Sequence, residues 1–385
     1  MTRNNRILVS VALLVIMCLS VLTTLSACGL SDVVSGIHKH SNGVYYTVYP
    51  LRRHATVHGF DRTDDVEQIY TIPSYVKYLG LRYSVTRFEG PNDLEDISSD
   101  WYRIVHGGNA KGLVVPKTVE YFSIGASYDD LKNMTFITVD ENNTHYKSVD
   151  GVLYSADGSN MIFYPPAKVT NSFTLPKEVT RITSPFFNQN ESVQEFYVES
   201  GSQTYCAING AIYTIDGSKL LYYPCGKHVD TFVIPKQMTE FDYDFFRHNE
   251  DIKYFEAEDG NRLYSAINGD VYSADGGILL FRKSHGNGAL ELPSSIRIVG
   301  EGTLDGVEYL YVPVGLEKIV FKTSFRYETN VNNPLGDIEY VFFESKILPH
   351  YARYVKFSSA YLGVTAEQFW LAVGGDFGEL KPMEM

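Results

Sequence analysis

The stretch NGAIYTIDGSKLLYYP, residues 209–224, occurs in two further versions along the 385-residue chain. Residues 150–165 read DGVLYSADGSNMIFYP, and residues 268–281 read NGDVYSADGGILLF. When the copies are aligned on their Asp-Gly pairs at 157–158, 216–217 and 275–276, both steps are 59 residues. A fixed period of this kind indicates stacked units that bury their apolar faces against one another. An Asp-Gly pair between two alternating apolar segments predicts a β-hairpin in each unit, because both residues tolerate the positive φ of tight turns.

A second module alternates with these hairpins. It begins at a corner made of an apolar residue and a proline, as in LPKEVTRI (175–182) and IPKQMTEF (234–241), with prolines at 116, 176, 235 and 293. Proline indicates a corner or a strand edge, where no ladder donor is needed. A short strand with apolar residues at i, i+3 and i+5 follows, and this rhythm is typical of leucine-rich repeats. The residues expected to face the core are Met134, Ile137, Val139, Val193, Phe196, Val198, Ile252, Phe255, Ala257, Val307, Leu310, Val312, Ile338, Val341 and Phe343.

These segments resemble BspA-type leucine-rich repeats over residues 110–345, with a looser fit over residues 42–109. Two departures from that family are clear: a hairpin interrupts every 59-residue unit, and the Ala-Phe pair before the turn is Phe186-Phe187 or Phe245-Phe246. We therefore expect a mainly β leucine-rich-repeat solenoid, each unit combining a short repeat strand with an inserted hairpin. The resemblance implies attachment to host proteins, to matrix or to neighbouring cells.

The two ends of the chain are expected to cap the array. Residues 42–109 are interpreted as a β-rich N-terminal cap or diverged repeat, and residues 346–385 as a C-terminal cap. Within the latter, TAEQFWLAV (365–373) predicts a short helix, since Thr365 and Gln368 can form a capping box. Terminal repeats need a covered outer face, which such a helix would supply.

The first residues indicate export. Arg3 and Arg6 precede an apolar run from Ile7 to Leu22, and the sequence LSAC ends at Cys28. This pattern is typical of a signal peptide. The ending resembles the bacterial lipobox, which implies cleavage after residue 27 and acylation of Cys28, so that residues 28–41 form a lipidated tether at the cell envelope. The alternative is an uncleaved membrane anchor.

Two further cysteines, Cys206 and Cys225, flank the second copy of the repeated motif. Their joint appearance in one unit of an exported chain favours a disulfide that staples that hairpin. If Asp216-Gly217 is a two-residue turn, Cys206 lies opposite Lys227, within plausible reach of Cys225. Two thiols are the alternative.

Composition and motifs indicate a binding protein without catalysis. The formal net charge of −13 argues against nucleic acid as a partner. The sequence has no zinc-binding His pair, nucleophile elbow or phosphate loop. We therefore expect neither an enzyme nor a cofactor or metal site.

The candidate binding residues are aromatic side chains at outward positions of the repeat strands. Stacked parallel strands would align them in adjacent columns, and aromatic columns supply large contact areas for partners. The alternative is that they pack beneath the inserted hairpins. We predict adhesion through a protein partner, with glycan capture or an envelope scaffold as other possibilities. The residues concerned are Phe136, Tyr197, Tyr254, Tyr309, Tyr311, Tyr340 and Phe342.

Overall fold

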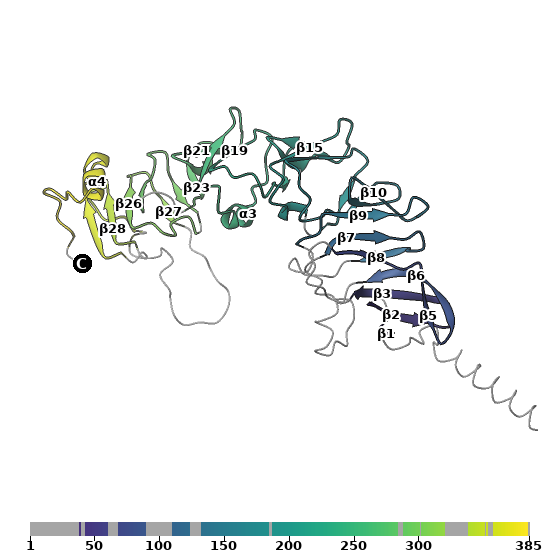
Figure 1. Ribbon diagram of the computed structural model, residues 1–385. Helices are drawn as coiled ribbons and strands as arrows, with labels where there is room; N and C mark the ends of the chain where they lie inside the picture. The colour runs from purple at the N-terminus through teal and green to yellow at the C-terminus, as the bar shows by residue number, and fades with distance from the viewer. Residues whose placement is uncertain are drawn as a thin grey trace, which may run out of the picture. The chain divides into compact units, whose positions relative to one another are not determined.

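A computed structural model describes residues 38–39, 43–60, 68–89, 110–123, 132–184, 187–283, 288–300, 302–319, 338–350, 352 and 357–383 (Figure 1). The predicted signal peptide, Cys28 and all of the predicted tether except residues 38–39 lie outside these ranges. Within the described ranges, no helix is long and apolar enough to span a membrane.

The chain divides into two compact parts. The N-terminal part extends to Gln194 and also contains residues 199–203 and 224–226; the C-terminal part contains residues 195–198, 204–223 and 227–385. Short strands dominate both parts (Figure 1).

The described elements of the N-terminal part are fourteen strands and one 3-10 turn. They are β1 (His38–Lys39), β2 (Val44–Tyr49), β3 (His54–Phe60), β4 (Gln68–Thr71), β5 (Tyr75–Tyr78), β6 (Leu81–Glu89), β7 (Ala110–Val115), β8 (Tyr121–Ser123), β9 (Phe136–Val139), β10 (Tyr146–Val149), β11 (Val152–Ser155), β12 (Asn160–Phe163), β13 (Ser172–Leu175), β14 (Arg181–Ile182) and η4 (Phe187–Gln189).

The described elements of the C-terminal part are strands with two short helices. They are β15 (Glu195–Val198), β16 (Tyr205–Ile208), β17 (Ala211–Thr214), β18 (Leu220–Tyr222), β19 (Thr231–Ile234), α3 (Tyr243–His248), β20 (Tyr254–Ala257), β21 (Tyr264–Ile267), β22 (Asp270–Ser273), β23 (Ile278–Phe281), β24 (Ala289–Glu291), β25 (Ile298–Val299), β26 (Tyr309–Val312), β27 (Lys318–Ile319), β28 (Tyr340–Phe343), β29 (Ser359–Leu362) and α4 (Ala366–Val373).

The repeat strands form parallel ladders, as a leucine-rich repeat requires. β4, β7 and β9 pair in parallel, β19 pairs with β20 in parallel, and β24, β26, β28 and β29 form a four-stranded parallel sheet. The predicted inward residues are buried, apart from Val198 and Ala257, which are partly covered. The predicted leucine-rich-repeat fold is therefore confirmed.

Each predicted corner is a turn closed on its proline. The amides of Val179, Met238 and Ile296 donate to the carbonyl oxygens of Pro176, Pro235 and Pro293 at 3.1, 3.0 and 3.0 Å. Pro176 and Pro235 directly follow the last residue of a strand, and Pro293 comes two residues after the end of β24. Each proline fixes φ for the turn without removing a ladder donor. The corner spacing read from the sequence therefore sets the spacing of the strands.

The inserted element is a three-stranded meander rather than a simple hairpin. In the second repeat (β15 to β18) the order is β16-β17-β18, and in the third repeat (β20 to β23) β21, β22 and β23 follow the same order. The first turn is Asn209-Gly210, with φ of 50° and 75°, and Asn268-Gly269 repeats it with 53° and 86°. Positive φ at both central residues is the requirement of a type I′ hairpin. The first repeat (β9 to β12) has Asp150-Gly151 at this turn, with φ of 49° and 77°.

The predicted register around Cys206 is wrong, because the tight turn of the second repeat is Asn209-Gly210 and not Asp216-Gly217. Asp216-Gly217 lies in a longer loop joining β17 to β18, and Cys206 on β16 is opposite Tyr213 on β17, not opposite Lys227. Cys206 is half-buried, its thiol 3.1 Å from the carbonyl oxygen of Thr214, and Cys225 is exposed. The two cysteines are not joined by a disulfide in the structure, and the staple stays a prediction.

The C-terminal helix α4 forms as predicted. Thr365 accepts from the Gln368 amide, and the Gln368 side chain accepts from the Thr365 amide, at 3.2 and 3.0 Å. This capping box satisfies donors that a helix start leaves open. The helix buries Phe369 and Ala372, which pack with Tyr361 and Val364 at the end of the parallel sheet.

Candidate functional site: the aromatic face of the repeat strands

The predicted aromatic residues do not form one continuous column. Phe136 lies on β9, Tyr197 on β15 and Tyr254 on β20, and these strands belong to three different sheets. Only Tyr309, Tyr311, Tyr340 and Phe342, on β26 and β28, share a sheet.

The meanders interrupt the column. In each of the three repeats, an amide of the repeat strand donates to the carbonyl oxygen of the glycine in the first meander turn: Ile137 to Gly151, Phe196 to Gly210 and Phe255 to Gly269, at 2.8, 2.8 and 2.9 Å. The turn therefore lies beside its own repeat strand. In a continuous column, the repeat strand of the next unit would have to occupy that position. The alternative that aromatic side chains pack against the inserted element holds for Tyr254, because a Cβ built on Gly269 of the meander turn would lie 2.7 Å from Cδ1 of its ring. The Phe136 ring instead lies against Gly112 of β7.

In the C-terminal sheet the predicted alignment is confirmed. Tyr309 pairs with Tyr340, and Tyr311 with Phe342, in the parallel register of β26 and β28. The rings of Tyr309 and Tyr340 stack with centroids 4.9 Å apart and planes at 15°, and Phe377 lies 5.5 Å from Tyr340. All three are partly exposed. We call Tyr309, Tyr340 and Phe377, with Glu308 and Glu339 beside them, the tyrosine face.

Tyr311 and Phe342, by contrast, are core residues. They are 6% and 0% exposed, so their prediction as surface residues is wrong. Phe369 of α4 lies 5.6 Å from Tyr311 and 5.4 Å from Phe342, measured between ring centroids. Strand alternation put these side chains on the correct face of the sheet, but the C-terminal helix covers this part of it.

Carboxylates accompany the exposed tyrosines. Burial and then the neighbouring Glu308 raise the pKa of Tyr309, and a hydrogen bond with Glu339 is the main cause of the raised pKa of Tyr340. Tyr197 donates to Glu195, which raises the pKa of that phenol as well. Each phenol is therefore neutral over the physiological range, and negative charge lies next to an aromatic ring.

The exposed aromatic residue of the C-terminal helix was missed from the sequence. Trp370 of α4 is 47% exposed, and its indole nitrogen donates to Glu291 Oε2 at 2.6 Å. The sequence pattern could have predicted this exposure, because Trp370 lies outside the apolar stripe that Phe369, Ala372 and Val373 form along the helix.

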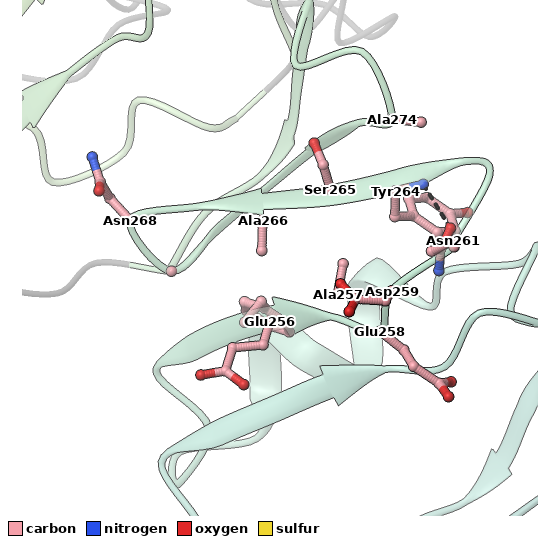
Figure 2. A pocket seen from close by; sticks show the side chains of 13 residues that line it. Glu256, Ala257, Glu258, Asp259, Asn261, Tyr264, Ser265, Ala266, Asn268 and Ala274 are labelled. Atoms are coloured by element: carbon pink, nitrogen blue, oxygen red, sulfur yellow. Dashed lines mark hydrogen bonds between the residues drawn. The ribbon is translucent and has the colours of Figure 1, made fainter.

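A separate pocket of about 530 Å³ lies in the third repeat, between β20 with its following loop and the hairpin β21–β22 (Figure 2). Its wall carries three carboxylates, from Glu256, Glu258 and Asp259. Glu258 accepts from the Lys236 amide at 2.9 Å, while the Asn261 side chain donates to the Pro235 carbonyl oxygen and accepts from the amides of Leu263 and Tyr264. Asparagine therefore holds the loop on one side of the pocket.

In the part of the chain that the structure describes, no cluster of three His, Cys, Asp or Glu residues could hold a metal ion. The candidate sites are surfaces and an acidic pocket, whose chemistry is that of hydrogen bonding, aromatic contact and charge attraction.

Several solved structures of bacterial proteins are similar to this chain. The pneumococcal vaccine antigen PcpA is 15% identical, with 85% of each chain covered and a TM-score of 0.37. A leucine-rich cell surface protein from Faecalibacterium prausnitzii is 13% identical, with 89% of this chain and 99% of that chain covered and a TM-score of 0.31. A leucine-rich-repeat protein from Bacteroides ovatus is 15% identical, with 83% and 77% covered and a TM-score of 0.28.

No protein-family model matches the chain, and no curated protein sequence matches it either. The chain has leucine-rich repeats, with a meander in each 59-residue unit. That assignment rests on the corners, the parallel ladders and the buried i, i+3, i+5 residues described above.

Proposed function

We propose that the chain is a bacterial surface lipoprotein that binds a protein partner through the tyrosine face. The observation that carries this proposal is the stacked pair of Tyr309 and Tyr340, which stays partly exposed on a sheet whose neighbouring aromatic residues are buried. Aromatic side chains of this kind supply contact area at low entropic cost and are enriched where binding energy is concentrated. Adhesion to host, matrix or neighbouring cells follows as the biological role.

The test is a binding screen with the full-length chain against host extracellular proteins and bacterial envelope proteins, with glycans on a parallel plate. Tyr309→Ala combined with Tyr340→Ala should weaken a protein hit by roughly 30-fold or more, the loss of about 2 kcal/mol typical of a hot spot. Tyr75→Ala is the matched control, because Tyr75 is 43% exposed and lies in the N-terminal part.

The outcomes separate the alternatives. A protein hit that survives the double substitution contradicts the tyrosine face as the site. A glycan hit alone would assign the protein to nutrient capture, and partners that co-purify only from the native membrane would indicate an envelope scaffold.

Anchoring through Cys28 is part of the proposal and has its own test. Cys28→Ser removes the thiol that would receive the lipid, so the chain should leave the membrane fraction after cell lysis. Retention of the Cys28→Ser chain in the membrane would favour an uncleaved apolar anchor instead.

A further inference from the structure

The three repeats share a turn whose first carbonyl oxygen can accept an additional hydrogen bond. Asp150, Asn209 and Asn268 occupy this position with φ between 49° and 53°, and a glycine with positive φ follows each of them. The following glycine uses its own carbonyl oxygen to accept from the repeat strand. The backbone at this turn is therefore the same in each repeat, and only its surroundings differ.

In the first two repeats a lysine ammonium group occupies the site at this turn. Lys168 Nζ donates to the Asp150 carbonyl oxygen at 2.7 Å and contacts Asp150 Oδ2 at 2.8 Å. Lys227, 59 residues on, donates to the Asn209 carbonyl oxygen. Only 13% of the Lys168 side chain is exposed, so this ammonium group is held in a defined place rather than on the open surface.

The second repeat also shows what surrounds the ammonium group. A Cβ built on Gly210 would lie 3.0 Å from Lys227 Nζ and 3.2 Å from Cγ of Glu195. The group therefore lies over the turn, beside the outward side chain of the repeat strand β15. A carbonyl dipole and a nearby carboxylate both favour a cation there.

The third repeat keeps the turn and lacks the lysine. The equivalent position, 286, is glycine, which carries no side chain. Lys283, three residues earlier in the chain, donates to the carbonyl oxygen of Asn249. Among the described residues, no hydrogen bond is donated to the carbonyl oxygen of Asn268.

The surroundings of this turn are suited to a cation from outside. Tyr254 takes the place of Glu195, and a Cβ on Gly269 would lie 2.7 Å from Cδ1 of the Tyr254 ring. Glu256, two residues further along the same outward face of β20, is exposed and lines the acidic pocket with Asn268 (Figure 2). An aromatic ring, a carboxylate and a carbonyl oxygen are the three groups that recognise an ammonium ion.

We propose that the pocket of the third repeat binds the ammonium group of a lysine side chain on a partner protein, beside the turn that Lys168 and Lys227 contact in the other repeats. This inference rests on the proposed function, in that it names the chemistry of the partner. Lysine fits better than arginine because the internal occupants are lysines, whose compact charge needs one acceptor rather than a planar fork.

The experiment measures binding of a fluorescent peptide of alternating Gly and Lys to the full-length chain by anisotropy. The same peptide with every lysine acetylated, which removes the charge, should not bind. Tyr254→Leu should weaken binding roughly tenfold, from loss of the cation–π contact. Glu256→Gln should weaken it roughly threefold at low salt, because the carboxylate is exposed and screened.

Two conservative choices keep the test informative. Tyr254→Phe retains the ring and should retain binding, and circular dichroism establishes that each variant is folded. Glu141→Gln is the matched control. Glu141 is an exposed carboxylate in the first repeat, where Lys168 already occupies the turn at Asp150. Equal binding of the acetylated peptide, or binding that neither Tyr254→Leu nor Glu256→Gln reduces, would overturn the proposal.

This result is separable from the proposed function. The peptide assay uses no natural partner, so its failure leaves the tyrosine face to be judged by the protein screen. If Tyr309→Ala with Tyr340→Ala abolishes binding of a protein partner and Tyr254→Leu leaves that binding unchanged, the tyrosine face is the binding site. The lysine pocket then takes no part in binding that partner.

Discussion

In the second repeat, Ala211 begins the central strand of the meander and Tyr223 follows the last strand, and both are buried. In the third repeat, 59 residues on, the same positions hold Asp270 and Arg282, which are equally buried. Asp270 Oδ2 lies 3.7 Å from Arg282 Nε, and burial lowers the pKa of Arg282. Both repeats have the same strand order and the same glycine turn.

The comparison teaches that the backbone of the repeat does not depend on the chemistry packed inside it. Turns with positive φ, proline corners and ladder hydrogen bonds recur, while a neutral alanine and tyrosine in one repeat are replaced by an ion pair in the next. Such an exchange is tolerated because the pair as a whole is neutral and fills the space, whereas either charge alone would be costly.

The largest effect is expected from breaking the ion pair. Asp270→Ala leaves Arg282 buried without its carboxylate and should lower the free energy of unfolding by about 3–5 kcal/mol. Within the described residues Arg282 Nε and Nη2 make no hydrogen bond, and Nη1 donates to the Asp305 carbonyl oxygen at 3.4 Å, a neutral acceptor that does not replace the charge of Asp270. Urea denaturation followed by circular dichroism measures the change.

The double variant Asp270→Ala with Arg282→Tyr sharpens this test, because it rebuilds the pair of the second repeat. It should recover stability to within about 1 kcal/mol of the natural chain or exceed it. A double variant as unstable as Asp270→Ala would show that the two repeats are not interchangeable at these positions.

A second large effect concerns an aromatic cluster at α3 that does not recur 59 residues later. Phe246 of α3 is fully buried, with ring centroids 4.6 Å from Phe232 and 4.5 Å from Phe241, whereas the equivalent position, 305, is aspartate. Phe246→Ala should cost about 3–5 kcal/mol through the cavity it leaves, and Phe246→Leu much less. Thermal unfolding that Phe246→Ala leaves unchanged would contradict this packing.

A moderate effect is expected at the lysine that distinguishes the two repeats. Lys227→Ala removes the ammonium group from the Asn209 carbonyl oxygen and should lower stability by about 1 kcal/mol. Lys219→Ala is the control, since Lys219 makes a surface ion pair with Glu240 at 3.0 Å, which is worth less. Equal losses in the two variants would show that Lys227 has only a surface role.

A smaller effect separates the second meander turns of the two repeats. Hydrogen bonds from Thr214 and Ser218 lower the pKa of Asp216 to about 2. Asp275 has the equivalent bond from Ser273 and also one from Arg297 at 2.7 Å, so its pKa is lowered further. NMR titration should find Asp216 above Asp275 and both below the ordinary value of roughly 3.9.

The sign of the linked stability follows from these lowered pKa values. Each carboxylate stabilises the fold fully above its unfolded pKa, and this contribution is lost as pH falls through the folded pKa, between about 4 and about 2 for Asp216. Thr214→Ala should raise the pKa of Asp216 towards its ordinary value and leave that of Asp275 unchanged. A titration of Asp216 that does not respond to Thr214→Ala would rule out this hydrogen bond as the cause.

The smallest effect is expected at Cys206, where the third repeat has Ser265. The serine hydroxyl donates to the Ser273 carbonyl oxygen at 2.7 Å, as the Cys206 thiol does to Thr214. Cys206→Ser should therefore change stability by less than about 0.5 kcal/mol. Alkylation and mass spectrometry should modify the exposed Cys225 before Cys206, whose pKa is raised by burial. Protection of both residues until a reductant is added, with a stability loss of about 2–4 kcal/mol on reduction, would instead establish the disulfide.

The sequence alone determined the 59-residue period, the proline corners, the inward residues of the repeat strands and the capping box of the last helix. All of these depend on local chemistry: φ at proline and glycine, the alternation of a strand, and donors at a helix start. The extra meander strand escaped the sequence interpretation because Asn209-Gly210 and Asp216-Gly217 are both plausible turns, and choosing between them depends on which strands pair.

Only the tertiary structure decided which outward aromatic residues meet solvent. Tyr309 and Tyr311 occupy the same face of β26, two residues apart, yet α4 buries Tyr311 and leaves Tyr309 partly exposed. The same holds for the third-repeat pocket, where the missing lysine matters only because the turn and β20 lie side by side. Alternation fixes the direction of a side chain, whereas its environment comes from elements that lie far away in the sequence.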